Sequence, residues 1–146
     1  MPQELGKHIE VLAMVRQRVG QQALRAAMLD YWGGACAVTG IALPEVLRAS
    51  HAKPWADCAT DAERLNVFNG LLLCANLDAL FDRFLISFDD TGELLVSDRV
   101  SVADRERLGL IGCTGLRWVA PEHLPFLGYH RKRMVEGVSA ANAPPA

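Results

Sequence analysis

The sequence predicts an α+β fold in which helices at the two ends enclose short strands. Apolar residues recur at helical spacing from Glu4 to Asp30, and a second helical segment is expected from about Glu122 to Glu136, opened by Pro121. Between them lie short apolar and β-branched runs separated by turn residues, which is typical of strands. A chain of 146 residues fits one domain.

The first third of the chain is predicted to be helical and then extended. Gly20 interrupts the first helical pattern, so one or two helices are expected there. Gly33 and Gly34 end that pattern. Two strands are then predicted, at residues 35–39 and 45–51, the second of them ending on His51.

The middle of the chain is predicted to contain a loop and a short helix. Residues 57–64 are polar and read as a loop, and a short apolar run follows at residues 70–73. Asn76 is expected to cap a helix containing Leu77 and Phe81.

A hairpin is the strongest local prediction. Residues 84–88 and 93–97 favour strands, and the turn between them, Asp89-Asp90-Thr91-Gly92, places glycine where a positive φ is needed. A short helix is expected at residues 102–108. The tail, residues 138–146, is rich in Ala and Pro and is expected to be disordered.

Composition indicates a globular, cytoplasmic protein. Hydrophobic residues form 51% of the chain, but no apolar stretch approaches the roughly 18 to 20 residues needed to span a bilayer, so no membrane partner is expected. The first ten residues do not resemble a secretory signal. The formal net charge is -2, so any affinity for nucleic acid must be local.

The four cysteines do not predict a zinc site. They are Cys36, Cys58, Cys74 and Cys113, and none forms a Cys-x-x-Cys pair. Buried free thiols are the expected state in a cytoplasmic chain.

Four side chains suggest metal-assisted chemistry. His51 ends a predicted strand, Asn69 follows a loop, and Asp78 and Asp82 are four residues apart, so both carboxylates would project from one helix face toward one cation. Carboxylates favour Mg²⁺ or Mn²⁺ over Zn²⁺. A histidine can take a proton from water, and an asparagine can hold the ring or the neighbouring loop.

Four sequence blocks follow one another in order. They are Cys36-Ala37-Val38-Thr39-Gly40, Arg48-Ala49-Ser50-His51-Ala52-Lys53-Pro54-Trp55, Asn69-Gly70-Leu71-Leu72-Leu73, and Leu77-Asp78-Ala79-Leu80-Phe81-Asp82-Arg83-Phe84-Leu85-Ile86-Ser87-Phe88. Together these blocks resemble the HNH endonuclease family, in the branch found in restriction-type proteins. The similarity extends over about residues 24–96, and the segment around residues 123–131 also resembles that branch.

The resemblance implies a ββα-metal core at about residues 24–97, within one nuclease domain of residues 1–137, with flanking helices and the extra hairpin. It implies that His51 is the general base and that Asn69 braces the loop. Asp78 and Asp82 match the two helix positions that hold metal-binding histidines in colicin-type nucleases. Ser50 stands where the family often has a metal ligand.

Alternatives remain for each of these residues. Asp78 and Asp82 are also common as helix-surface acids, and Asn66 is a second candidate for the central asparagine. Four further residues are expected to contact DNA, with surface solvation or structural roles as the alternatives. They are Arg48, Lys53, His130 and Arg131.

The sequence therefore predicts a metal-dependent endonuclease that hydrolyses DNA, as the cleavage module of a restriction or defence system. Target recognition is expected from another domain, a partner chain or a homodimer. The alternative is a nuclease-derived module that binds nucleic acid or protein with a degenerate metal site.

Overall fold

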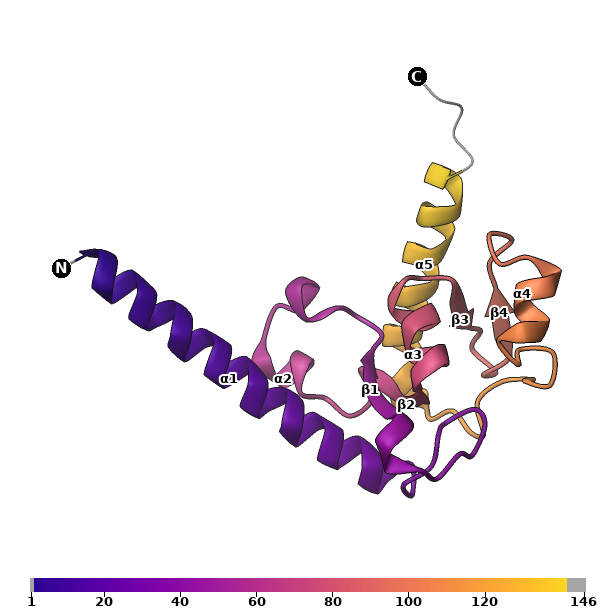
Figure 1. The fold of residues 1–146 in the computed structure, drawn as a ribbon, viewed down its shortest axis with the longest axis horizontal. Coiled ribbons are helices and arrows are strands. Elements are labelled where there is room, and N and C mark those ends of the chain that lie inside the picture. The colour runs from indigo at the N-terminus through magenta and orange to yellow at the C-terminus, as the bar shows by residue number, and fades with distance from the viewer. Residues whose placement is uncertain (1, 142–146) are drawn as a thin grey trace.

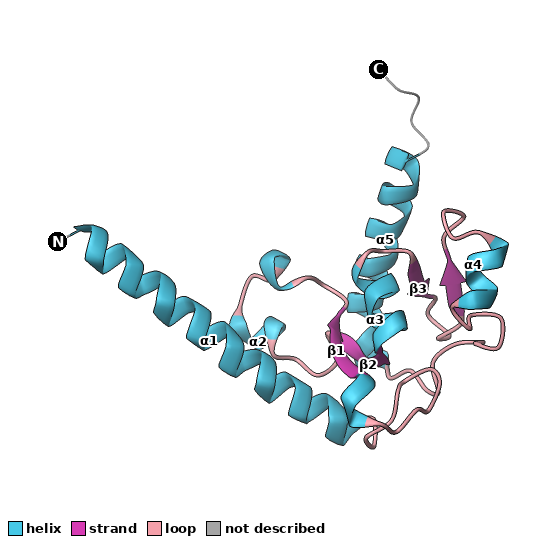
Figure 2. Cartoon of the chain, in the orientation of Figure 1, coloured by secondary structure: helices cyan, strands magenta, loops and turns pink. Residues whose placement is uncertain are grey.

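The computed structural model describes residues 2–141, with side chains for residues 6–135, and has the expected α+β architecture (Figures 1 and 2). Two small antiparallel sheets lie among five α-helices and three short 3-10 helices. The elements in order are α1 (Pro2–Tyr31), η1 (Pro44–Val46), β1 (Leu47–His51), η2 (Trp55–Asp57), α2 (Asp61–Arg64), β2 (Gly70–Cys74), α3 (Ala75–Asp82), β3 (Ile86–Phe88), β4 (Leu94–Val96), α4 (Val102–Arg107), η3 (Pro121–His123) and α5 (Leu124–Ala141).

The central unit is a β-hairpin followed directly by a helix. β1 pairs with β2 in antiparallel register, with Ser50 opposite Leu71 and His51 opposite Gly70. Every residue of β2 is buried, so the strand joins the core on both faces. α3 begins at the residue after β2 and buries Leu77 and Phe81. The ββα core expected from the sequence is therefore present.

The prediction of a strand at residues 35–39 is wrong, because this segment forms turns. Gly33, Gly34 and Gly40 all adopt positive φ, which bends the chain too sharply for a ladder. Ala37 donates one backbone hydrogen bond to Leu72, at 2.7 Å. The partner of β1 is instead the apolar run that became β2, since its residues can be buried on both faces.

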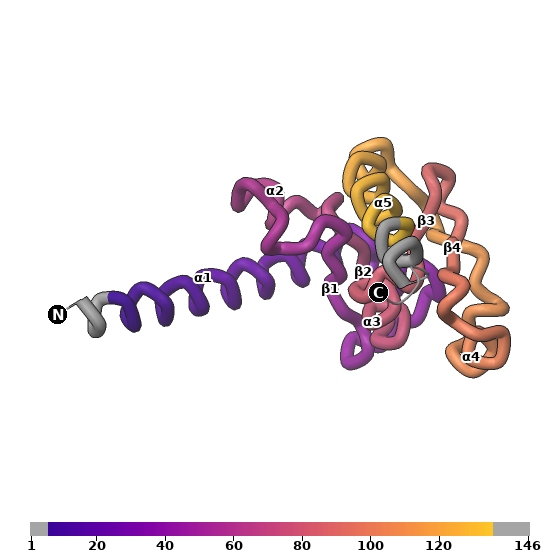
Figure 3. Tube along the Cα trace, turned by 90° about the horizontal axis from the view of Figure 1, so that it is seen from above, coloured from indigo at the N-terminus to yellow at the C-terminus, as the bar shows by residue number. Residues whose placement is uncertain are grey.

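α1 is one continuous helix, although Gly20 lies within it. A Cβ at Gly20 would lie 3.1 Å from the Leu65 side chain and 3.2 Å from that of Trp55, so glycine allows the loop to pack closely there. The C-terminal part of α1 buries Leu24 and Met28, whereas the N-terminal part extends away from the other elements (Figures 1 and 3).

The second sheet and the last helix complete the core. β3 and β4 form the predicted hairpin, and the Asp89 carboxylate accepts hydrogen bonds from the backbone of Thr91 and Glu93 across the turn. α4 agrees with the predicted short helix. α5 extends to Ala141, past the predicted end at about residue 136, and the remainder of the expected tail lies outside the described residues.

The residue that caps α3 is not Asn76, which the sequence predicted. Cys74 caps α3 through its backbone position, while Asn76 lies inside the helix and donates to the Leu108 carbonyl at 2.9 Å. All four cysteines are free: Cys36, Cys58 and Cys74 are buried and Cys113 is partly exposed. Among the described residues, no helix combines the length and apolar character required to cross a bilayer.

His130 of α5 belongs to the core, with 1% of its surface exposed. Its ring stacks on Phe81 at 3.7 Å between centroids, and Nε2 lies 2.7 Å from the Phe81 carbonyl. A carbonyl only accepts, so Nε2 carries the proton and Nδ1 accepts from the Ser87 hydroxyl, 2.8 Å away. Burial lowers the pKa of His130 to about 4, so the ring is neutral at pH 7.

Gly70→Ala should disrupt the ββα unit. A Cβ at Gly70 would lie 1.9 Å from the Ser50 carbonyl oxygen, and its φ of 147° strains any other residue. We expect the free energy of unfolding to fall by about 3 kcal/mol in urea titrations. Gly112→Ala, where a Cβ meets open space, is the matched control. Equal stability of the two variants would contradict this packing.

His130 should make stability depend on pH. Its folded pKa of about 4 lies below the ordinary 6.5, so the unfolded chain binds the proton first, and stability falls as pH drops from about 6.5 toward 4. The loss over that window is on the order of 3 kcal/mol. Urea titrations between pH 7 and 4.5 should show a shallower fall for His130→Gln than for wild type. Parallel curves would refute the buried neutral ring.

Candidate active site

His51 ends β1 with its ring orientation and tautomer set by the following loop. Its Nε2 lies 2.8 Å from the carbonyl oxygen of Arg64, and the Trp55 ring meets it edge-on at 5.9 Å. Because a carbonyl only accepts, Nε2 must carry the proton. The Nδ1 lone pair has no hydrogen-bond partner among the described residues and is left to act as a base.

Asn69 is buried and holds together the two ends of the loop between β1 and β2. Its Oδ1 accepts from the Lys53 backbone N–H at 2.8 Å, and its Nδ2 donates to the Glu63 carbonyl at 3.1 Å and to the Lys53 carbonyl at 3.3 Å. Asn66, the other candidate, only closes a local turn with Phe68. The sequence allowed the asparagine to hold either the histidine ring or the neighbouring loop. In the structure, Asn69 holds the loop.

The side chain of Arg64 strengthens the same loop. Its guanidinium donates to the carbonyls of Trp55 and Cys58, at 3.1 and 2.9 Å, and to Asp61 at 2.9 Å. These bonds fix the backbone carbonyl that accepts the hydrogen bond from His51 Nε2–H. Arg64 therefore positions the histidine through its main chain, a role that no sequence motif indicated.

Asp78 lies beside His51 in a hollow of about 280 Å³, which we call the His51 hollow. The Ser50 hydroxyl, itself buried, donates to Asp78 Oδ1 at 2.6 Å and orients the carboxylate. The structure therefore brings the histidine and one carboxylate together. The hollow is lined by His51, Asp78, Arg48, Gln21, Leu24 and Arg25, among others.

Asp82 does not join this group. It is the last residue of α3, its side chain is exposed, and it is absent from the lining of the His51 hollow. The shared helix face placed both acids on one side of α3, but the hollow reaches only the first turn. The geometry therefore does not support the expectation that both carboxylates hold one cation.

The possible metal ligands at the His51 hollow suit a hard metal ion that keeps several bound waters better than an ion surrounded by protein ligands. Within the described part of the chain, no three His, Cys, Asp or Glu side chains cluster to enclose a metal. Mg²⁺ commonly uses one or two carboxylates and keeps several waters, with substrate phosphate completing its shell. Asp78 in an open hollow fits this pattern, whereas a tetrahedral zinc site needs more protein ligands.

Two arginines line the His51 hollow. Arg48 was expected from the sequence to contact DNA, whereas Arg25 was not. Arg48 is exposed, and its guanidinium donates to the carbonyls of Glu45 and Leu47 at 3.0 Å each. Arg25 of α1 donates to the carbonyls of Pro44, at 2.9 Å, and Leu47. Helical spacing placed Arg25 on α1, but only the packing of α1 on β1 brings it to the hollow.

The other expected DNA contacts lie elsewhere. Lys53 forms an ion pair with Glu63 at 2.6 Å, which raises the pKa of the lysine and lowers that of the acid, so both stay charged. Neither lines the His51 hollow. His130 is buried, so the expectation that it contacts DNA is wrong, because a side chain closed off by Phe81 and Ser87 cannot reach a phosphate.

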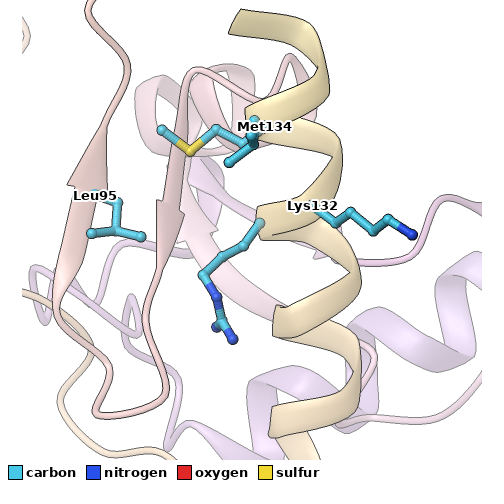
Figure 4. A pocket seen from close by; sticks show the side chains of 5 residues that line it. Leu95, Lys132 and Met134 are labelled. Carbon is cyan, nitrogen blue, oxygen red and sulfur yellow. The ribbon is translucent and has the colours of Figure 1, made fainter. Parts of the chain in front are cut away.

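Arg131 has a structural role away from the His51 hollow. It donates to the Phe88 carbonyl at 2.8 Å and to Asp90 at 2.7 Å, which ties α5 to the hairpin turn. It also borders an open apolar groove between β4 and α5, across which Leu95 and Met134 point toward one another (Figure 4). The groove is separate in its lining from the His51 hollow.

Comparison with protein families gives a match over the middle of the chain. Residues 36–89 match the family model described as HNH endonuclease, a segment that runs from the turns before β1 to the end of β3. Comparison with curated proteins finds no match. The matched segment contains the complete ββα unit, with the histidine, asparagine and aspartate described above. Residues 36–89 therefore match an HNH endonuclease domain.

Proposed function

We propose that the protein is a metal-dependent endonuclease that hydrolyses phosphodiester bonds in DNA, with His51 as its general base. The main support is the hydrogen bond of His51 Nε2 to the Arg64 carbonyl, which leaves Nδ1 as the basic nitrogen. His51 shares its hollow with Asp78. The match of residues 36–89 to the HNH endonuclease model supports a nuclease.

His51 would take a proton from a water molecule whose oxygen attacks the phosphorus. The new phosphorus–oxygen bond forms while the bond to the leaving oxygen breaks, and the leaving oxygen takes up a proton from solvent. The hydrogen bond from Nε2–H to the fixed Arg64 carbonyl stabilises the imidazolium that results. Asn69 acts through the loop and is a positioning residue, since its amide is buried against Lys53 and Glu63.

Asp78 is the residue that would hold a divalent ion, with Mg²⁺ or Mn²⁺ favoured over Zn²⁺. Ser50 orients its Oδ1, and Oδ2 makes no hydrogen bond to another described residue, so it is free to bind. A bound ion supplies charge stabilisation to the phosphate oxygens and the leaving oxygen. Arg48 at the hollow's edge would neutralise the same phosphate or its neighbour.

The wider setting is also a proposal. A net charge of -2 provides little general attraction to DNA, which favours target recognition by another domain, a partner chain or a second copy. The resemblance of the sequence blocks to restriction-type proteins supports a role in restriction or defence. Four free thiols are in keeping with the reducing cytoplasm.

One observation favours a second candidate, a DNA-binding module without cleavage. Ser50 replaces a residue that is often a ligand in the family, and its hydroxyl is used to bind Asp78. A site with a single anionic donor binds metal weakly, so a chain of this kind could retain the fold and lose the chemistry.

His51→Ala should lower plasmid cleavage about 10²- to 10⁴-fold, the range for loss of a general base. Supercoiled plasmid is incubated with Mg²⁺ or Mn²⁺ and the nicked and linear forms are followed over time. EDTA should abolish cutting. His8→Ala, an exposed histidine of α1, is the control and should cut normally. Equal cleavage by wild type and His51→Ala would remove His51 from the mechanism, and binding without cutting would favour the second candidate.

Asp78 and Asp82 provide a matched pair of carboxylates. Asp78→Asn should raise the Mg²⁺ concentration needed for half-maximal cleavage about tenfold or more, because it removes the anionic donor in the hollow. Asp82→Asn makes the same charge change one helical turn away and should leave that concentration close to the wild-type value. The reverse order of effects, measured in Mg²⁺ titrations, would move the metal away from Asp78.

A further inference from the structure

α1 carries a concentration of positive charge beside the His51 hollow. From residue 11 to residue 29 the helix contains three arginines and no acid, in a chain whose net charge is -2. Arg18 makes no ion pair with any described carboxylate and is exposed to solvent. This local charge is available to an external anion.

A groove on α1 continues the His51 hollow along the helix. A shallow hollow of about 200 Å³, which we call the α1 groove, is lined by Met14, Gln17, Arg18 and Gln21. Gln21 also lines the His51 hollow, so the two depressions meet at this side chain. Residues 14, 18, 21 and 25 follow one face of a helix, since they are spaced by three and four.

The opposite side of α1 has a different character. Arg16 is two residues from Arg18, which turns it by about 200° around the helix axis, away from the α1 groove. The exposed apolar residue Leu12, four residues before Arg16, lies toward that side. Arg16 and Arg18 therefore carry the same charge at nearly the same height on α1, but on opposite faces.

We propose that the α1 groove binds the sugar-phosphate backbone of duplex DNA beside the cleavage point. The inference rests on the proposed nuclease function. Arg18 pairs with a phosphate, and the amides of Gln17 and Gln21 donate to neighbouring phosphate oxygens. Seven residues from Arg25 to Arg18 span about 10 Å, the length of about three base pairs. α1 runs outward from the rest of the fold (Figure 3), so the helix would extend the substrate contact away from the scissile phosphate.

The test compares Arg18→Gln with Arg16→Gln, which change net charge equally. Binding to a 30-base-pair duplex is measured at several salt concentrations in the His51→Ala background, so that no cutting occurs. Arg18→Gln should weaken binding and reduce the slope of log K against log salt by about 1, as expected for one lost phosphate contact. Arg16→Gln should leave the slope close to that of the parent, and Arg18→Lys should retain it.

In the cutting-competent background, Arg18→Gln should raise KM and leave kcat close to wild type. Equal changes in binding for the Arg16 and Arg18 variants would mean that only overall charge matters, and would overturn the groove while leaving the nuclease intact. The α1 groove is also overturned if the wild-type protein cuts DNA normally and Arg18→Gln does not weaken DNA binding in the His51→Ala background. Wild-type protein that neither binds nor cuts DNA would overturn both proposals.

Discussion

The amide of Asn69 is the constraint on which the site depends. It hydrogen-bonds to Lys53 at the beginning of the loop after β1 and to Glu63 in α2, so a connection that contains only the short helices η2 and α2 is held together as a unit. The loop carries the Arg64 carbonyl that accepts the hydrogen bond from His51 Nε2–H. Because an unpaired amide in this buried position would be costly, the contacts of Asn69 define one loop conformation, and with it one tautomer of the histidine.

The histidine and the aspartate of the hollow come from different elements of the ββα unit. The distance between them therefore depends on how β1 pairs with β2. His51 ends β1, whereas Asp78 lies in the first turn of α3, after β2. The Ser50–Asp78 hydrogen bond links strand to helix directly. Because the carboxylate is already oriented, binding of the proposed cation would cost little further side-chain entropy.

Charge is distributed so that local attraction offsets an acidic whole. Lys53 and Arg131 are both neutralised by acids, while Arg48 and Arg25 remain at the hollow and Arg18 continues along α1. In the proposed complex, Arg48, Arg25 and Arg18 are the cations on the side of the hollow and the α1 groove. Arginines paired elsewhere contribute to the fold instead, as Arg117 does by donating to the carbonyls of Trp32 and Cys36.

The sequence by itself determined the α+β class, the hairpin at residues 84–97, the long terminal helices and the candidate residues His51, Asn69 and Asp78. These follow from short-range periodicity, turn chemistry and the order of motif blocks. Tertiary structure alone decided that residues 35–39 turn, that Asp82 faces solvent, that His130 is buried and that Arg25 and Gln21 reach the hollow. Those outcomes depend on contacts between residues far apart in the chain, and local pattern carries no information about which distant surface a side chain will meet.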